Sequence, residues 1–556
     1  MSFVVRTLFI LSLSFVGLYS AASPFPTEED ANGWFKQYTQ SLTDSQTYQL
    51  LKQFPKGGDL HHHLSGSAYG KWWYELATNQ ALNGGYQYFT KINHSECDSA
   101  PLFHTISNTT HSKLTKCEQK QYKALNALSN KEQEAFIHSV ELDKPEEGRE
   151  EFFEFHWQRL SELTQNPYIT AQVLLRNMEL YQQENVRYLE TQMNVRFMNR
   201  ADGSRFPPAG ALKVITDMLD SEPAKATGVT VRFQYALVRF TDNIEAQLDW
   251  IFKFVDANRK WYVGINLVGR EDDPRGQPTR FLAPITRLRA QYPAIRLSFH
   301  AGESEHADTN IRDTLLLGAE RIGHGINLLK DPSTYLLMRH NRYLIETNLI
   351  SNLKLEYIDD LSAHPFPQLL RTGVPTALST DDRGMWDATL TDEYYLAFTQ
   401  FNLSWSELVT LSQNSIKYSF LQDEKKEQLL TELNRDLTQF LALIAESADQ
   451  IPSANSKVQP LNSNVERYSD FICEFAASVC ANEGNNKEIT RKEPGLQITA
   501  NYFTIYMIVR HFFLHLPRHF SIYLQASSVS LPRLLLLHQH WALLNTRLIL
   551  SVWPCL

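Results

Sequence analysis

Between residues 58 and 382 the chain repeats one pattern: a short β-rich run, a polar turn, and a segment with apolar residues at helical spacing. Segments 169–183 (ITAQVLLRNMELYQQ) and 245–260 (EAQLDWIFKFVDANRK) are examples of the helical spacing. Alternating strands and helices are typical of an α/β protein with a parallel sheet, and eight such units predict a closed (β/α)8 TIM barrel. The predicted strands are 58–64, 186–194, 229–239, 262–271, 296–303, 320–326, 342–352 and 374–382.

One part of the chain departs from this pattern. About 120 residues separate the first two predicted strands, far more than the other connections. Residues 80–125 within this gap are polar and lack helical or strand periodicity, which predicts a loop-rich insertion after strand 1.

Polar and titratable residues collect where the predicted strands end. In barrels of this type the carboxyl ends of the strands form the face that carries the chemistry, so we expect the functional site there. The residues concerned are His61, His63, Glu190, Gly269, His300, Glu303, His324, Asn348, Asp381 and Asp382.

Several of these residues favour a metal site. His61 and His63 alternate along a strand, so both side chains point to the same face, which is the interior of a barrel. FHAGE, RIGHG and LSTDD add further His, Glu and Asp side chains at three other strand ends. Burying such groups together is costly unless a cation or mutual hydrogen bonds compensate. Three His and one Asp suit Zn²⁺, with Fe²⁺ and Co²⁺ as alternatives. A single metal is favoured over two, because strand four ends in GINLVGRED without the Lys that often bridges two metals.

The motifs GDLHHHLSG, FHAGE, RIGHG and LSTDD, in this order, resemble the adenosine deaminase family, supported by GINLVG and AHPFPQLLRTGVPTALSTDD. The resemblance covers about residues 50–445. The N-terminus and the Cys-bearing insertion are similar to the exported adenosine deaminase growth factor branch. The resemblance implies hydrolysis of adenosine, and of 2′-deoxyadenosine, to inosine and ammonia with one Zn²⁺ per chain and no organic cofactor.

The resemblance also implies a role for each matching position. The metal ligands would be His61, His63, His300 and Asp381. As catalytic residues, Glu303 would donate a proton to N1 of the purine, and His324 would orient and deprotonate the attacking water. Asp382 would hydrogen-bond N7, and the backbone N–H of Gly269 would meet N3.

One position departs from the family. Many cytosolic members have Asp two residues after the second metal-binding His, where it contacts the ribose 5′-hydroxyl, and here that residue is Ser65. Ser65 would still contact substrate, but without a charge, so another 6-aminopurine or modified purine is an alternative substrate. A catalytically silent extracellular binding protein is a further alternative; the presence of every expected ligand and acid–base residue argues against it. His62 should point away from the site by strand alternation.

The composition excludes other classes. The chain is 43% apolar and 21% charged, which indicates a globular protein. Its net charge of −9 argues against nucleic acid as a partner, so a small-molecule nucleoside is the expected one. The sequence leaves a homodimer open.

The N-terminus, MSFVVRTLFILSLSFVGLYSAAS, has one Arg before an apolar run that ends in small residues. This is the layout of a signal peptide over residues 1–22, with an uncleaved anchor as the alternative. We therefore expect a secreted or periplasmic protein. In an oxidising compartment Cys97 and Cys117 could close the insertion, and Cys473 and Cys480 could pair, which leaves Cys555 odd.

The C-terminus changes composition twice. After a predicted catalytic region over residues 23–450, residues 451–495 are polar and predict a linker. Residues 496–556 are rich in Leu, His and aromatic residues, and four Arg interrupt them. We interpret this tail as a stretch of erroneous translation. An interfacial membrane segment and an additional packed element are the alternatives.

Overall fold

The structure, a computed structural model, describes residues 23–94, 96–145, 147–304 and 306–448. The predicted signal peptide, linker and hydrophobic tail, with Cys473, Cys480 and Cys555, lie outside the described residues. Within the described part, no helix is both long and apolar enough to cross a membrane.

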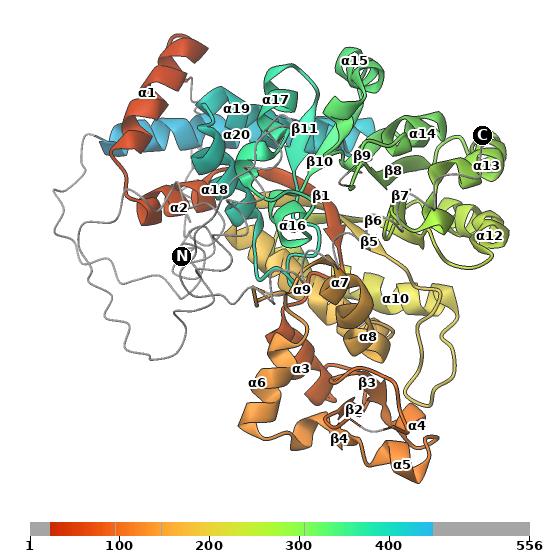
Figure 1. The fold of residues 1–556 in the computed structure, drawn as a ribbon. Helices are drawn as coiled ribbons and strands as arrows, with labels where there is room; N and C mark the ends of the chain where they lie inside the picture. Colours follow the sequence, from red (N-terminus) through yellow and green to blue (C-terminus); the bar gives the residue numbers. More distant parts are fainter. Residues whose placement is uncertain (1–22, 95, 146, 305, 449–556) are drawn as a thin grey trace, which may run out of the picture. The chain divides into compact units, whose positions relative to one another are not determined.

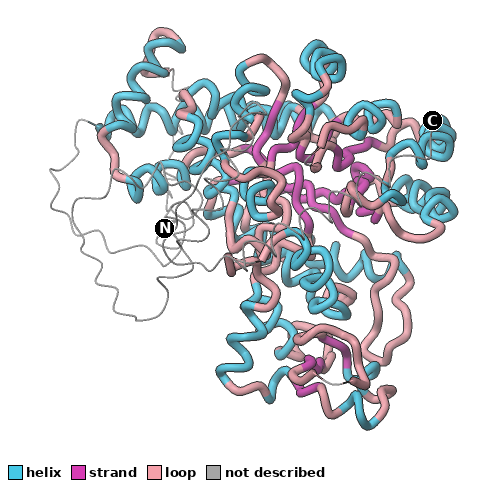
Figure 2. The backbone as a smooth tube through the Cα atoms, in the orientation of Figure 1, coloured by secondary structure: helices cyan, strands magenta, loops and turns pink. Residues whose placement is uncertain are grey.

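Eight parallel strands form one sheet whose neighbours follow each other in chain order, so the predicted (β/α)8 barrel is confirmed (Figure 1). Figure 2 shows these strands, in magenta, gathered between helices. The strands are β1 Gly57–His63, β5 Val186–Met193, β6 Thr230–Val238, β7 Tyr262–Val268, β8 Arg296–Ala301, β9 Arg321–His324, β10 Leu344–Thr347 and β11 Thr376–Leu378.

The barrel closes between β1 and the segment that follows β11. A parallel bridge joins His62 to Asp381. The backbone N–H of His63 donates to the carbonyl of Asp381 at 3.0 Å, and the N–H of Asp381 donates to the carbonyl of His61 at 2.9 Å. The seam of the barrel therefore brings the first and last strands together at the residues predicted to bind metal.

Helices lie between the strands in the sequence. One of them is α9, which runs over Pro167–Gln183 and precedes β5. Its first turn is fixed by Asn166, whose side chain accepts hydrogen bonds from the N–H groups of Tyr168 and Ile169. The other helices of the barrel are α10 Pro208–Leu219, α11 Glu222–Ala226, α12 Ile244–Ala257, α13 Leu282–Gln291, α14 Asn310–Leu316, α15 Pro332–His340, α16 Leu349–Lys354, α17 Phe366–Arg371, α18 Leu390–Phe401, α19 Trp405–Lys417 and α20 Asp423–Ala448. Helices α1 Glu28–Gln40, α2 Asp44–Gln53 and α3 Gly70–Thr78 flank β1 in the sequence.

The predicted strand over residues 342–352 is too long. Strand β10 ends at Thr347, and residues 349–354 form α16. Leu and Ile recur among polar residues through LIETNLISNL, and so short a pattern does not distinguish a buried strand from a buried helix. The N-terminus of α16 is held by Glu393, whose carboxylate accepts from the N–H groups of Leu349 and Ile350.

The insertion is more ordered than predicted. It contains a three-stranded antiparallel sheet in the order β3-β2-β4, coloured orange in Figure 1. Its strands are three or four residues long, too short to show periodicity in the sequence. The elements between α3 and α9 are β2 Tyr88–Lys91, β3 Thr105–Ser107, α4 Asn108–His111, α5 Lys116–Gln119, β4 Tyr122–Ala124, α6 Asn130–His138, α7 Arg149–Glu151, a π-helical turn Phe152–His156 and α8 Trp157–Leu160.

A disulfide joins Cys97 to Cys117, 20 residues apart in the chain. Closing a loop of this size stabilises the folded insertion by about 3 kcal/mol in the loop-entropy description. We therefore expect the Cys97→Ser/Cys117→Ser variant to be cut faster by trypsin at Lys113, Lys116 or Lys120, while the far-UV circular dichroism of the barrel is retained. Wild type reduced with dithiothreitol should behave alike. Equal cleavage rates with and without the disulfide would contradict this expectation.

Candidate metal centre and active-site cavity

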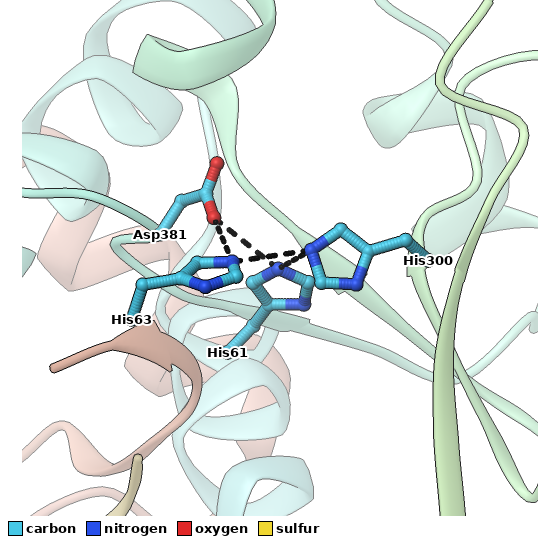
Figure 3. Close-up of side chains that lie close together, drawn as sticks. All are labelled: His61, His63, His300 and Asp381. Carbon is cyan, nitrogen blue, oxygen red and sulfur yellow. Dashed lines mark hydrogen bonds and ion pairs between the residues drawn. The ribbon is translucent and has the colours of Figure 1, made fainter. Parts of the chain in front are cut away.

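Four side chains converge at the carboxyl end of the barrel, and each offers one metal-ligand atom (Figure 3). They are His61, His63, His300 and Asp381, and their ligand atoms all lie within 4.8 Å of one another. Nε2 of His300 lies 3.0 Å from Nε2 of His61 and 3.2 Å from Nε2 of His63. Oδ1 of Asp381 lies 3.3 and 3.1 Å from the same nitrogens of His61 and His63. The structure thus brings together the four residues predicted as ligands.

The alternation of β1 separates the three consecutive histidines. His61 and His63 face the barrel interior, as their contacts with His300 show. His62 is buried on the other face, where Nδ1 lies 2.8 Å from Oγ1 of Thr191 and Nε2 lies 3.4 Å from Oδ1 of Asn177. His62 therefore packs against α9 and β5 and points away from the metal group, as strand alternation requires.

Two residues of the site have an unusual backbone conformation. Asp381 and His324 have φ angles of 57° and 65°, in the left-handed region that residues other than glycine rarely adopt. Such conformations persist where the surrounding structure imposes them, and they concentrate at functional sites. A close approach also explains Gly323, because a Cβ there would come within 2.5 Å of Cε1 of His61.

The donor set fits a divalent cation. Nδ1 of His61 lies 2.7 Å from the carboxylate of Glu346, and Nδ1 of His300 lies 2.9 Å from Oδ1 of Asn266. When each Nδ1–H donates to its oxygen, each Nε2 keeps a lone pair directed at the other ligands. Lone pairs and a carboxylate crowded together in a buried site repel one another unless a cation lies between them. The second oxygen of Asp381 accepts from Oγ of Ser351 at 2.6 Å, which leaves Oδ1 for the cation.

The contact between Glu346 and His61 gives a prediction on metal affinity. We expect Glu346→Gln to weaken metal binding by about 10–100-fold, the usual effect of losing a carboxylate behind a metal-ligating histidine. Glu190→Gln is the matched control, because Glu190 and Glu346 both pair with Arg321 at 2.6 Å and only Glu346 contacts His61. Titration with a chelator measures both affinities. Metal affinity weakened equally in the two variants would mean that the loss comes from Arg321 and not from the contact between Glu346 and His61.

Three members of the metal group, His63, His300 and Asp381, line a cavity of about 550 Å³. The remaining residues predicted to act in the site also line it: Ser65, Gly269, Glu303, His324 and Asp382. Room for Asp382 is provided by Gly66, since a Cβ at that position would overlap the carboxylate. Aromatic side chains cover much of the rest, from Trp73, Phe152, Phe153, Trp157, Phe197 and Phe240. The cavity is therefore mostly apolar with polar groups at the metal end, as in sites for small organic ligands.

Glu303 is placed and tuned as a proton donor. It is 4% exposed, and its loop is held by Glu271, whose carboxylate accepts from the N–H groups of Gly302 and Glu303 at 3.0 Å each. Burial, with the nearby charges of Asp381 and Glu271, raises the pKa of Glu303 well above its usual range. A carboxyl group whose pKa is raised in this way keeps its proton to higher pH and can donate it.

His324 has the complementary state. Burial lowers the pKa of His324 to about 3, so the imidazole is neutral and can accept a proton. Its Nδ1 lies 3.0 Å from the side-chain amide of Asn352 and 3.6 Å from Oε1 of Glu303. Oδ1 of Asn352 lies 3.0 Å from Nε2 of His364, which keeps the amide nitrogen of Asn352 directed at the His324 ring. Burial also raises the pKa of Asp382 to about 8, so this carboxyl group can donate a hydrogen bond near neutral pH.

Sequence reasoning missed the residues behind the metal ligands. Glu346 and Asn266 lie within otherwise apolar strands and contact His61 and His300. Ser351 contacts Asp381 from α16. The signal that identifies Glu346 and Asn266 is a single polar residue in the middle of a buried strand, which needs a specific partner.

The chain is similar in sequence to known adenosine deaminases. Residues 117–436 match the sequence profile of the family described as adenosine deaminase. An adenosine deaminase from Aedes albopictus is 30% identical over 262 residues, which are 45% of this chain and 48% of that protein. An adenosine deaminase from Lutzomyia longipalpis is 26% identical over 410 residues, which are 70% of this chain and 78% of that protein. The chain therefore spans about half the length of the first relative and about three quarters of the second.

Solved structures share the barrel. An adenine deaminase from Arthrobacter aurescens superposes with a TM-score of 0.52 at 19% identity, over 70% of this chain and 99% of that chain. An amidohydrolase from Burkholderia ambifaria, with bound Zn, superposes with a TM-score of 0.53 at 18% identity, over 72% of this chain and 94% of that chain. At these identities the likeness shows the fold.

Proposed function

The chain belongs to the adenosine deaminase family, and from this premise we propose that it hydrolyses adenosine to inosine and ammonia with one bound Zn²⁺. The observation that carries the proposal is the position of the acid and the base beside the metal group. The ring centroid of His324 lies 4.9 Å from that of His61 and 5.1 Å from that of His300. Oε1 of Glu303 lies 3.6 Å from Nδ1 of His324, and both residues line the same cavity.

In the proposed reaction the protein residues divide the proton transfers. When bound to His61, His63, His300 and Asp381, Zn²⁺ supplies a Lewis acid that makes water a nucleophile near neutral pH. Neutral His324 accepts a proton from the attacking water. Protonated Glu303 donates to N1 of the purine and makes C6 electrophilic. The water oxygen bonds to C6, His324 passes the proton it accepted to the amino group, and the C6–N6 bond breaks to release ammonia. The remaining hydroxyl proton returns to Glu303 as the C6 carbonyl of inosine forms.

Two further groups orient the purine in this scheme. Asp382 donates a hydrogen bond to N7, which its raised pKa favours. The backbone N–H of Gly269 is assigned to N3; a φ of 96° places this residue in a conformation that glycine adopts freely. These contacts recognise the base, and the sugar would contact other residues of the cavity.

The test is a substrate panel on the purified chain, with ammonia release as the readout. We expect adenosine and 2′-deoxyadenosine to be converted, and adenine to be a poor substrate because it lacks the groups that fill the outer cavity. Preferred conversion of adenine would favour the second candidate, the same barrel acting on another 6-aminopurine. That candidate rests on Ser65, which places a neutral hydroxyl where many relatives carry a carboxylate.

Ser65 gives a prediction on selectivity at the sugar. We expect Ser65→Asp to raise the preference for adenosine over 5′-deoxyadenosine by about tenfold or more, because a hydrogen bond to a charged group is stronger than one to a hydroxyl. Ser65→Ala is the control and should bring the two kcat/KM values closer together. A preference that is the same in all three proteins would remove Ser65 from the sugar contact.

We further propose that the protein is exported to an oxidising compartment. The layout of residues 1–22 supports this, and so does the Cys97–Cys117 disulfide, since structural disulfides persist mainly outside the cytosol. N-terminal sequencing of protein recovered from the medium or periplasm tests it. A start near residue 23 is expected, whereas full-length protein retained in the cytosol would contradict it.

A further inference from the structure

Gln192 is a buried cavity residue that the proposed reaction does not use. It occupies the second-last position of β5 and is 2% exposed. Neither Oε1 nor Nε2 of its side chain has a hydrogen-bond partner among the described residues. A buried amide without partners is costly, and nearly all such groups in proteins are satisfied by protein, water or ligand. The partner of Gln192 therefore comes from the cavity that it lines.

Strand pairing fixes where the amide points. Gln192 is two residues after Glu190, which faces the barrel interior and pairs there with Arg321, so both side chains share that face. In the register of β1 and β5, Gln192 lies opposite His63. The backbone carbonyl of Gln192 accepts from the N–H of Leu64 at 3.2 Å, and Ser65 is the residue after Leu64. Gln192 thus lies beside His63 of the metal group and lines the same cavity as Ser65, the predicted sugar contact.

Four other uncharged polar residues of the cavity wall have protein partners. The hydroxyl groups of Thr164 and Thr170 donate to backbone carbonyls at 2.8 and 3.0 Å. Oδ1 of Asn194 accepts from a backbone N–H at 2.8 Å, and Oε1 of Gln165 accepts from Asn199 at 2.6 Å. Gln192 differs because both ends of its amide are unused.

The unpartnered atoms around this cavity follow a pattern. Among the described residues that line it, buried atoms without a hydrogen-bond partner include Nε2 of His324, Oδ1 of Asp381 and Oδ1 of Asp382. The proposed function assigns each of these to metal, water or purine. Gln192 remains, with Nε1 of Trp73, which can only donate. We expect the amide of Gln192, like these atoms, to contact a ligand that occupies the cavity.

The chemistry of the amide selects its partner. A side-chain amide donates through nitrogen and accepts through oxygen, so it matches a group that does both, such as a hydroxyl. The described residues that line the cavity include no Lys or Arg, so a phosphate would find no cation there. We propose that Gln192 is a specificity-determining residue that hydrogen-bonds the sugar hydroxyls of the bound nucleoside. This inference rests on the proposed function, because it requires a nucleoside in the cavity.

Binding of the reaction product tests the inference independently of turnover. Inosine and 9-methylhypoxanthine share the base, and only inosine carries sugar hydroxyls. Isothermal titration gives the ratio of their dissociation constants for the metal-loaded wild type and for Gln192→Leu. We expect wild type to prefer inosine and Gln192→Leu to lose about tenfold or more of that preference, because the hydroxyls lose their partner while the base keeps its contacts.

Matched variants make the result specific. Gln165→Leu makes the same change in the same wall at an amide whose oxygen already has a partner, and it should leave the ratio unchanged. Gln192→Met, which keeps the length of the side chain, replaces the Leu variant if that variant fails to fold. An unchanged ratio in a folded Gln192 variant would overturn the assignment of Gln192 alone. Wild type that binds no inosine would overturn the proposed function and this inference with it.

Discussion

Glu303→Gln is expected to lower kcat for adenosine by about 10²–10⁴-fold, the range in which general acid–base catalysis contributes. The amide has nearly the shape of the carboxyl group but has no acidic proton for N1 of the purine. Metal content and fold should be retained, because Glu303 is not among the four grouped ligands. The measurement is initial-rate kinetics with metal analysis of the same samples.

The raised pKa of Glu303 adds a pH dependence to this prediction. Only the protonated form donates, so kcat/KM of wild type should be highest below that pKa and fall as pH rises through it. The residual activity of Glu303→Gln should lack this decrease. Glu320→Gln is the control, because Glu320 precedes β9 at the opposite end of the barrel and pairs with Arg296. Near-wild-type turnover in Glu303→Gln would remove Glu303 from its role.

Asp381→Ala is expected to lose bound metal and, with it, activity. Asp381 is the only anionic member of the ligand group, and without it three neutral imidazoles face one another. The backbone bridge between Asp381 and His62 does not involve the side chain, so the barrel should still close. Elemental analysis after gel filtration measures metal per chain.

A graded control accompanies this variant. Ser351→Ala removes only the hydrogen bond from Oγ of Ser351 to Asp381, so it should weaken metal binding less than loss of the carboxylate does. Metal content equal to wild type in Asp381→Ala would overturn the ligand assignment.

Much of the fold follows from periodicity in the sequence. All eight barrel strands were predicted within a few residues of their observed starts, because each is a short β-rich run bounded by turns, and amphipathic helices lie between most of them. The C-terminal end of β10 was predicted less well, because Leu and Ile continue to recur into α16. The sheet of the insertion was not predictable, since strands of three residues are specified by tertiary pairing and by the Cys97–Cys117 closure.

The site, like the fold, was predictable from the sequence only in part. His61, His63, His300 and Asp381 were predictable as a group because charged or ligating residues at several strand ends meet on one face of a barrel. Their distances, and the support from Glu346 to His61, depend on side-chain packing between strands that are far apart in the sequence. Gln192 gave no signal in the sequence, because it is one of three consecutive polar residues in β5 and only its missing partners distinguish it.

Conversion of adenosine to inosine by the purified chain, with zinc per chain determined on the same sample, is the decisive measurement. We expect turnover by wild type with about one zinc per chain, as a site of three His and one Asp requires. Glu303→Gln should keep the zinc and lose the turnover. Zinc-loaded, folded wild type that leaves adenosine unchanged would show that the proposed reaction is wrong.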